Sequence, residues 1–354
     1  MAYTSIDDPS AHFQATLWTG DGNDNKQITN AGNSDLKPDL IWLKDRTQAE
    51  SPAIFDSTRG ASVRLQPNST GAESTESATQ KSFTTDGFTV GTSGSVNNGS
   101  NPDNYVAWQW VANGGTTASN SVGDIDSVVQ ANTDAGFSIV TYTGNGSQDQ
   151  TIGHGLGAVP KMILFKNRSN AAYWYVYHVD TGNDTMMYLN LTNAAQSLSS
   201  QFSTPTTTTF NVSNENSTFN GYNSSSQTYV AYVFADVQGY SKFDKYTGNG
   251  NSNGPFVYTG FKPAFVMIKR TDSTGGWTIY DTKRGFNGNN YELFPHSAEA
   301  EYTGTSYFEA DMLSNSFKLR LTDGQINATS GTYVYAAFAE NPFVTSTGIM
   351  GTAR

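Results

Sequence analysis

The five residues YTGNG at 142–146 recur at 246–250 and, as WTGDG, at 18–22. A strand signal that begins with Tyr-Val follows each of these sites, at Tyr105, Tyr229 and Tyr333. The opening aromatic residue and this tyrosine are 87 residues apart in all three copies. A repeat of this kind indicates an array of similar structural units, so it fixes the architecture before any local pattern is considered.

Short strand signals alternate with turns within each copy. An apolar run of four residues closed by lysine predicts a strand that is covered on both faces, and it occurs at Leu40–Lys44, Met162–Lys166 and Phe265–Lys269. A later signal has its apolar residues two apart, as in Phe88 and Val90, which predicts one buried face and one solvated face. Asn-Gly and Asp-Gly pairs between the strands suit the positive φ angles of tight turns.

These signals predict an all-β protein built of three tandem β-sandwich repeats of about 100 residues each, with jelly-roll and Ig-like topologies both open. The offset between copies is 124 residues and then 104, and the extra residues fall in the connector after the first copy. We therefore place the repeats at residues 1–112, 137–241 and 242–343, with a linker rich in Gly, Ser, Thr and Asn at 113–136 and a C-terminal tail at 344–354.

Composition excludes several classes of protein. The chain has 354 residues, of which 14% are charged and 13% are aromatic, and its formal net charge is −11. Because it has no basic cluster, it lacks the electrostatic signature of a nucleic-acid-binding protein. The absence of cysteine excludes disulfides and thiolate metal sites. No signal peptide and no apolar run of membrane-spanning length is visible, so we expect synthesis in the cytosol and no membrane partner.

No motif indicates a catalytic or cofactor site. No metal-binding spacing relates the four histidines, His12, His154, His178 and His296. The stretch 21–25 spaces oxygen side chains as a calcium loop does, but Lys26 and Gly32 occupy positions that the motif reserves for Gly and Glu. We therefore expect no catalytic residue, no cofactor and no bound metal.

A repeated Asp-x-x-Arg-Gly signal joins Asp56 to Arg59 and Asp281 to Arg284. We interpret it as an ion pair that fixes a turn beside a strand. In the second copy His178 replaces the aspartate and no Arg-Gly follows. A catalytic pair that is lost in one copy of three would be unusual, so the repetition favours a structural role.

Aromatic residues are the candidates for contact with another molecule. Tyr173, Tyr175 and Tyr177 alternate onto one face of a predicted strand, and Trp174 lies on the other face. We expect one of these faces to point outward. Tyr and Trp suit both protein interfaces and the stacking of sugar rings, and we favour packing against a neighbouring domain or subunit over contact with a glycan.

The sequence resembles a repeat family found in virion structural proteins of tailed bacteriophages, especially phages of marine bacteria. The resemblance rests on YTGNG, on the Pro-initiated strand that ends in Lys, on Asp-x-x-Arg-Gly, on Asp-Gly-Phe-x-Val at 86–90 and on the closing Ala337–Phe343. It covers nearly the whole chain, and the second copy departs from it most. The family implies a place in the virion, as a tail-fibre, tail-associated or head-surface component, and it implies no reaction.

Together, these observations predict a non-enzymatic structural protein on the surface of a phage particle. Its expected partners are other virion proteins and further copies of itself, in a homo-oligomer that the analogy with phage fibres makes a trimer. Edge strands and abundant aromatic residues would otherwise be left exposed. An adhesin that recognises a host surface glycan is the first alternative, and a polysaccharide-degrading tail enzyme is the second.

Overall fold

The structure is a computed structural model that describes residues 2–100, 103–197, 203–213, 221–285, 291–303 and 310–351. Its regular secondary structure is almost entirely β, which confirms the all-β prediction. The helical elements in these residues are short turns: α1 at Gly94–Asn97, α2 at Gly324–Asn327, and 3-10 turns at Pro9–Ala11 and Val179–Thr181. No described helix has the length and apolar character needed to cross a membrane.

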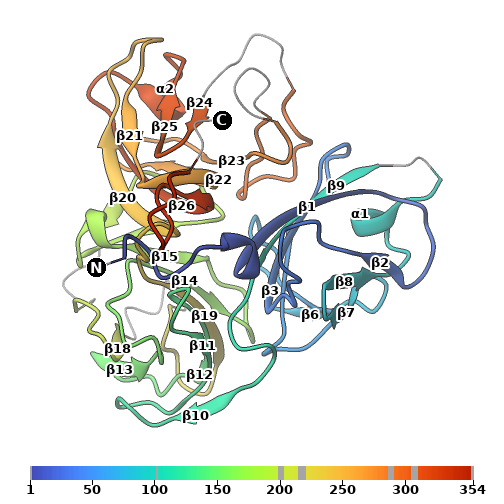
Figure 1. Ribbon diagram of the computed structural model, residues 1–354. Coiled ribbons are helices and arrows are strands. Elements are labelled where there is room, and N and C mark those ends of the chain that lie inside the picture. The colour runs from blue at the N-terminus through green and yellow to red at the C-terminus, as the bar shows by residue number, and fades with distance from the viewer. Residues whose placement is uncertain are drawn as a thin grey trace.

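Three main sheets repeat one strand order along the chain (Figure 1). In each, the Tyr-Val strand lies between the opening strand and the Pro-to-Lys strand, and a fourth strand follows. We name the segments that contain these sheets unit 1 (13–110), unit 2 (118–234) and unit 3 (241–342). In sheet order the antiparallel strands are β1 Phe13–Thr19, β9 Asn104–Trp110, β3 Leu40–Asp45 and β4 Ala53–Asp56 in unit 1; β12 Phe137–Thr143, β19 Thr228–Phe234, β14 Met162–Asn167 and β15 Tyr175–His178 in unit 2; and β20 Ser241–Thr247, β26 Thr332–Pro342, β22 Phe261–Arg270 and β23 Trp277–Asp281 in unit 3.

A smaller sheet accompanies each main sheet and shares an apolar core with it. In unit 1, for example, Phe88 and Val90 of the small sheet cluster with Ile41 and Leu43 of the main sheet. The small sheets are β2 Lys26–Ile28, β8 Gly87–Val90 and β7 Gln80–Thr84 in unit 1; β13 Gln150–Gly153 and β18 Thr209–Val212 in unit 2; and β21 Phe256–Tyr258, β25 Ser316–Leu319 and β24 Ala310–Leu313 in unit 3.

The structure corrects the prediction of a linker at 113–136. That segment contains β10 (Ala118–Asn120) and β11 (Ser127–Asn132), which extend the main sheet of unit 2 as antiparallel strands. Its composition is typical of a linker, but the edge of β12 supplies backbone hydrogen-bond partners that composition cannot reveal. Four further short strands complete the β-structure: β16 Thr185–Tyr188, β17 Gln196–Ser197, β5 Val63–Arg64 and β6 Ser74–Thr75.

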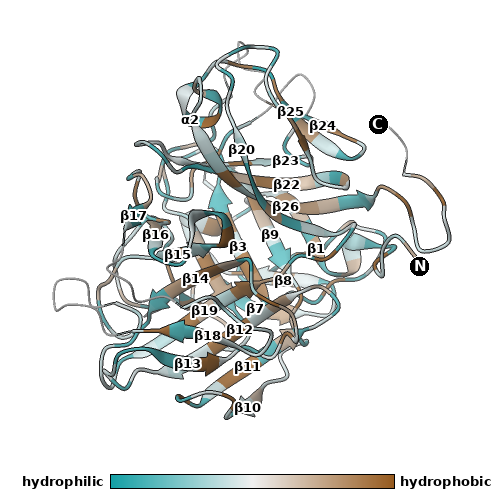
Figure 2. Cartoon of the chain, turned by 90° about the vertical axis from the view of Figure 1, so that its left-hand side faces the viewer, coloured by the Kyte–Doolittle hydropathy of each residue, from teal (hydrophilic) through white to brown (hydrophobic). Residues whose placement is uncertain are grey.

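The second face of each main sheet points to the middle of the molecule, where the three units surround a shared core (Figure 1). Figure 2 shows apolar stretches on the main strands, among them β14 and β22. The ring of Trp110 in unit 1 lies 6.3 Å from Phe234 of unit 2 and 5.5 Å from Phe338 of unit 3, and the two phenylalanines are 5.8 Å apart. These three rings hold the same register position in their sheets.

The repeated aromatic-Thr-Gly signal has one local role in all three units. Its opening ring stacks on the tyrosine of the neighbouring main strand, with centroid distances of 5.2, 5.1 and 4.9 Å in the pairs Trp18–Tyr105, Tyr142–Tyr229 and Tyr246–Tyr333. The polar tip of the ring donates to a backbone carbonyl oxygen, that of Val96, Tyr222 or Ile326. The buried asparagine that follows each carbonyl accepts from the loop backbone: Asn97, Asn223 and Asn327.

Glycine is required in this signal because the loop runs directly against another backbone segment. A Cβ atom on Gly144 would lie 2.4 Å from the carbonyl oxygen of Ser224. Cβ atoms on Gly20 and Gly248 would each lie 2.3 Å from an equivalent carbonyl oxygen. The repeated motif is therefore explained by packing within each unit.

We predict that Gly144→Ala lowers the free energy of unfolding by about 1–3 kcal/mol, because the added methyl group forces two backbone segments apart. Gly94→Ala is the matched control, since no atom lies within 4 Å of its Cβ position and the stability should change little. Urea denaturation followed by tryptophan fluorescence measures both variants. Equal stabilities of the two variants would contradict the close approach.

Candidate functional site

The predicted contact residues at 173–177 do not form a surface stripe. Tyr175 and Tyr177 are buried in the core between the two sheets of unit 2, and Tyr173 packs against that core. Trp174 belongs to the central core and is fully buried. The expectation that one face of this strand points outward is wrong, because both faces of β15 are covered by other parts of the chain.

Trp174 makes a contact between units. Its indole Nε1 donates to the carbonyl oxygen of Gln66 in unit 1 at 2.9 Å. The matching indole of unit 3, Trp277, donates to the carbonyl oxygen of Tyr188 in unit 2 at 2.8 Å. In both cases a unit reaches into the unit that precedes it in the chain.

A second kind of contact ends on the fourth strand of the main sheets of units 1 and 3. The indole of Trp108 in unit 1 donates to Asp281 of unit 3 at 2.9 Å, and the hydroxyl of Tyr232 in unit 2 donates to Asp56 of unit 1 at 2.7 Å. The two donors share one register position in their sheets, and the two aspartates share another. We name these contacts the 1/3 boundary and the 2/1 boundary.

A buried ion network surrounds each of these aspartates. At the 2/1 boundary Asp56 binds Arg59, Arg59 lies 3.4 Å from Glu73, and Glu73 binds Arg168 of unit 2 at 2.9 Å. Burial alone would lower the pKa of Arg59. The neighbouring Asp56 carboxylate outweighs this effect and raises that pKa, so the guanidinium stays charged. The 1/3 boundary repeats this network with Asp281, Arg284, Glu301 and Arg46 of unit 1.

The boundary between units 3 and 2 has a different chemistry, because Ala336 stands at the register position of the two donors. His178, which replaces the aspartate, supplies the donor instead, and its Nε2 lies 3.2 Å from the carbonyl oxygen of Tyr335. Its Nδ1 accepts from the backbone N–H of Asp180, so the ring is neutral with its proton on Nε2. Unit 2 thus lacks the Asp-x-x-Arg-Gly signal, and unit 3, which it faces at this boundary, lacks the Trp or Tyr side chain that would donate to the aspartate.

The lysine that closes each Pro-to-Lys strand crosses the same three boundaries. Its ammonium group donates to a backbone carbonyl oxygen of the neighbouring unit: Lys44 to Ala298 at 3.3 Å, Lys166 to Thr70 at 2.9 Å and Lys269 to Asn193 at 2.8 Å. Burial lowers the pKa of each of these groups to about 8. The strongest sequence signals of the chain therefore serve contacts between its own units.

The other residues considered from sequence lie apart from one another. His12 packs edge-on against Tyr240, and Nδ1 of His296 accepts from the backbone N–H of Trp277. Asp21 forms an ion pair with Lys26, the residue that breaks the calcium pattern. Within the part of the chain that the structure describes, no three His, Asp or Glu side chains are placed to hold a metal ion.

Two of the buried acids of unit 1, Asp45 and Asp103, lie close to one another. Burial raises the pKa of Asp45, and the charge of Asp103 adds to this effect. Asn167 and Gln227 occupy the same register positions in unit 2, and their side chains hydrogen bond to each other. Because an amide pair serves the same place in unit 2, we interpret Asp45 and Asp103 as residues that join the ends of neighbouring strands.

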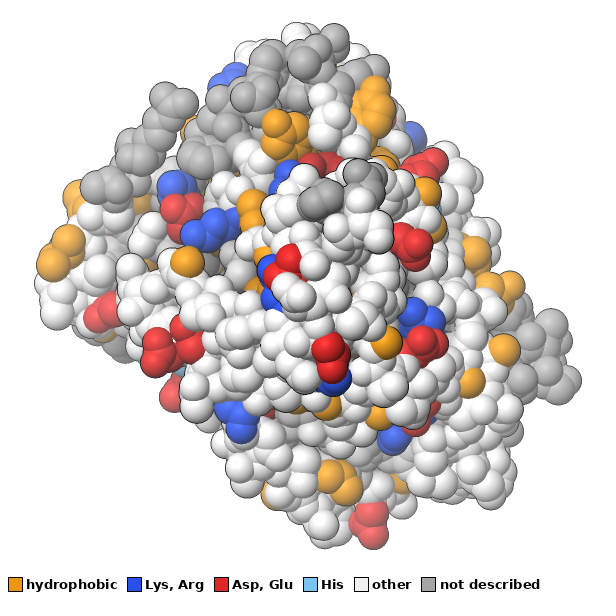
Figure 3. All heavy atoms as spheres, turned by 90° about the vertical axis from the view of Figure 1, so that its right-hand side faces the viewer, with side chains coloured by type: hydrophobic (Ala, Val, Ile, Leu, Met, Phe, Trp, Pro, Cys, Tyr) orange, Lys and Arg blue, Asp and Glu red, His pale blue; other side chains and the backbone are white. Residues whose placement is uncertain are grey.

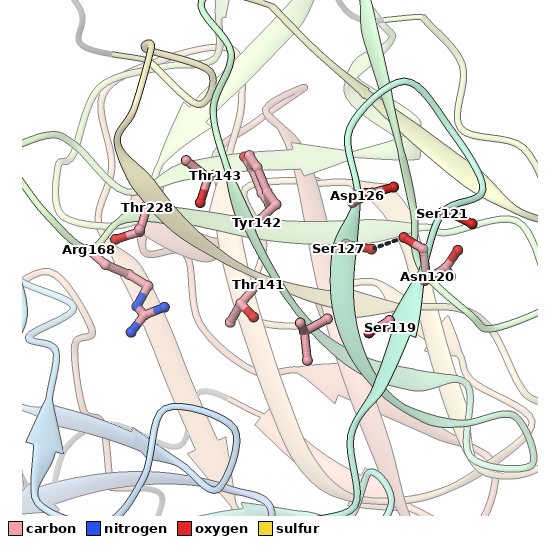
Figure 4. Close-up of a pocket in the computed structure, with 11 residues that line it drawn as sticks. Ser119, Asn120, Ser121, Asp126, Ser127, Thr141, Tyr142, Thr143, Arg168 and Thr228 are labelled. Carbon is pink, nitrogen blue, oxygen red and sulfur yellow. Dashed lines mark hydrogen bonds between the residues drawn. The ribbon is translucent and has the colours of Figure 1, made fainter.

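A polar groove of about 340 Å³ lies on unit 2 (Figure 4). Thr141, Thr143 and Thr228 stand between the side chain of Arg168 at one end and the residues of β10 and β11 at the other. The guanidinium of Arg168 is already paired with Glu73 at 2.9 Å. The groove therefore presents mainly hydroxyl and amide groups.

A comparison with protein families matches residues 8–342 to the family described as Domain of unknown function (DUF7483). The chain belongs to this family. The DUF7483 match starts before β1 and ends with the last residue of β26, so it spans all three units. Comparisons with curated proteins and with solved structures find no significant match.

Sequence reasoning missed most of the residues that join the units. Trp108 and Tyr232 read as core residues of a strand, and nothing in the repeat connects Glu73 or Glu301 with an arginine of another unit. The one sequence signal for contacts between units is that the second and third copies each differ from the repeat at one of these positions. His178 replaces an aspartate where Ala336 replaces a donor, but the two positions are 158 residues apart.

We predict that Asp281→Asn lowers the free energy of unfolding by about 3–5 kcal/mol, because Arg284 then keeps its charge in a buried site without its main partner. Asp272→Asn is the control, since the ion pair of Asp272 with Arg270 is partly exposed and its loss should cost about 1 kcal/mol or less. Guanidinium denaturation measures both changes. A loss at position 281 no larger than at position 272 would contradict a role for the 1/3 network.

Acid should weaken the boundary between units 3 and 2. Burial lowers the pKa of His178 to about 4 from 6.5, so the unfolded chain binds more protons than the folded chain between these values. The contribution of His178 is complete above pH 6.5 and is lost as the pH falls through about 4. We predict that His178→Gln flattens the decline of melting temperature between pH 7 and pH 4 relative to the unchanged chain. Parallel melting curves for the two proteins would count against this assignment.

Proposed function

We propose that this chain is a non-enzymatic structural protein on the surface of a tailed-phage virion, as a tail-fibre, tail-associated or head-surface component. We propose further that its three units are tandem β-sandwich repeats of jelly-roll or Ig-like type. The observation that carries the proposal is the use of the repeated polar residues. Asp56, Asp281 and the three strand-closing lysines all join one unit to another, which is the work of a scaffold.

The buried acids support a scaffold over a glycan hydrolase. Asp56 and Asp281 are each bound by an arginine in the interior, so neither is free to exchange a proton with a substrate. Asp45 and Asp103 are also buried, and amides take their places in unit 2. A glycosidase instead needs two carboxyl groups that flank a bound sugar.

The outer surface is largely polar, which suits a virion protein that is exposed to solvent. On the face shown in Figure 3, charged side chains are scattered among uncharged polar atoms, and the apolar spots are small. Self-association into a homotrimer and contact with other virion proteins stay predictions. Many of the aromatic rings that suggested self-association lie in the core between units.

One observation favours the adhesin alternative. Phe256 and Tyr258 lie on the same face of β21, and they are 55% and 48% exposed. Exposed aromatic faces stack on sugar rings. If the chain binds a host surface glycan, these two residues replace Tyr173, Trp174, Tyr175 and Tyr177 as the candidates for contact.

The test is quantitative mass spectrometry of purified particles of a phage that carries this gene, combined with immunogold labelling. The proposal predicts a fixed number of copies per particle at one position on the head or tail. Absence of the chain from particles would contradict it. Release of reducing sugar from host envelope polysaccharide by the purified chain would favour the enzyme. Saturable binding to host cells that Tyr258→Ala removes at unchanged melting temperature would favour the adhesin.

A further inference from the structure

The opening strand of each main sheet lies at a position where a further strand can add. In unit 1 the carbonyl oxygen of Trp110 accepts from Asp39 on the β3 side at 2.8 Å. Because backbone groups alternate in direction along a strand, the groups of Gln14, Thr16 and Trp18 pair with β9. Those of Ala15, Leu17 and Thr19 therefore point away from β9, and the backbone groups at the same register positions in units 2 and 3 point away from β19 and β26.

In unit 2 a strand occupies this edge. β11 pairs with β12 in antiparallel register, with Gln130 opposite Ile139 and Val128 opposite Thr141. The side chain of Gln130 reaches across to unit 1, where its Nε2 donates to the hydroxyl oxygens of Ser57 and Thr58 at 2.9 and 2.7 Å. Its Oε1 accepts from the backbone N–H groups of Asn113 and Gly115.

In unit 3 the matching edge is closed by side chains. The carboxylate of Asp236 accepts from the outward N–H of Phe243 at 2.8 Å. The next outward N–H, that of Lys245, donates to the side chain of Asp244 at 2.8 Å. A charged lysine on the outer edge also disfavours the addition of another strand.

In unit 1, within the described part of the chain, the opening strand has neither an added strand, as in unit 2, nor side-chain acceptors, as in unit 3. The N–H groups of Ala15, Leu17 and Thr19 have no hydrogen-bond partner among the described residues. Leu17 is 38% exposed, at the register position of Thr141 and Lys245. The edge borders a groove of about 370 Å³ between units 1 and 3, which we name the β1 groove and which is lined in part by Ala15, Gly32, Thr282, Lys283 and Asn341.

The β1 groove is the place that Gln130 fills in unit 2. Thr282 and Lys283 follow Asp281 as Ser57 and Thr58 follow Asp56, and Asn341 stands three residues beyond Phe338 as Asn113 stands three beyond Trp110. One of the three equivalent sites is therefore occupied by a strand of the chain itself, one is capped, and one is open.

We propose that the β1 edge binds an extended segment of another polypeptide chain, which adds to the sheet as β11 adds to β12. The segment runs antiparallel to β1, with an amide side chain opposite Ala15 that enters the β1 groove. A small aliphatic side chain lies opposite the exposed Leu17. Main-chain hydrogen bonds give such strand addition its affinity, and alternate side chains give its specificity. This inference rests on the equivalence of the units and not on the proposed place in a virion.

The test uses the sequence of β11 as the probe. A fluorescein-labelled peptide DSVVQANT, residues 126–133, is titrated into the full chain and followed by anisotropy. Saturable binding is expected, together with slower hydrogen exchange at Ala15, Leu17 and Thr19. Leu17→Pro removes one outward N–H and leaves the β9 ladder intact, so binding should weaken at least about tenfold. Lys245→Pro, the same change on the capped β20 edge, should leave peptide binding unchanged.

Modified peptides keep the test valid if Leu17→Pro does not fold. N-methylation at Val128 and Gln130 blocks the groups that face β12 in the chain and should abolish binding, whereas N-methylation at Val129, which faces β10, should not. Absence of peptide binding, or binding unaffected by either block, would overturn the proposal. So would a dimer of the chain in which the β1 amides are already protected, because a second copy would then be the occupant.

Discussion

The mutual packing of Trp110, Phe234 and Phe338 is the contact on which the rest of the structure depends. Each main sheet has one face covered by its own small sheet, and the other face is apolar as well. A single unit in water would expose that second face, so the three units must meet. The space left among them is about 20 Å³. That is room for roughly one water molecule, so the central core is close-packed.

Aromatic packing has little direction of its own, and the three main sheets are similar enough to meet in more than one arrangement. The polar contacts around the core remove this ambiguity. The buried indole N–H of Trp108 needs a hydrogen-bond acceptor from the neighbouring unit, and unit 3 supplies it with Asp281. The buried hydroxyl of Tyr232 needs one as well, and unit 1 supplies it with Asp56. His178 suits only a neighbour that presents a backbone carbonyl oxygen at this place, as Tyr335 does. A wrong order of units would leave the indole N–H of Trp108 or the hydroxyl of Tyr232 buried without an acceptor, which is costly.

The sequence predicts the content of each unit far better than the relation between units. Apolar runs such as Met162–Phe165 and spaced pairs such as Phe88 and Val90 identify strands because local burial leaves a local pattern. The same patterns do not say what covers the second face of a sheet, so either the tyrosine face at 173–177 or the opposite face with Trp174 was expected to point outward. β11 was missed because its partner strand, and not its composition, makes it a strand. The contacts between units join residues more than 70 positions apart, and the one trace of them in the sequence is the joint change at His178 and Ala336.

The 1/3 boundary joins unit 1 to a unit that is made much later, and this has a consequence for how the protein is made. A ribosome delivers unit 1 long before Asp281 and Glu301 have been synthesised. Trp108 and Arg46 must therefore wait in the growing chain without their final partners. Unit 2 can dock on unit 1 at once through Tyr232 and Asp56, since both have by then emerged. Emergence of unit 3 is then the step of synthesis that covers the last of the apolar faces turned toward the shared core.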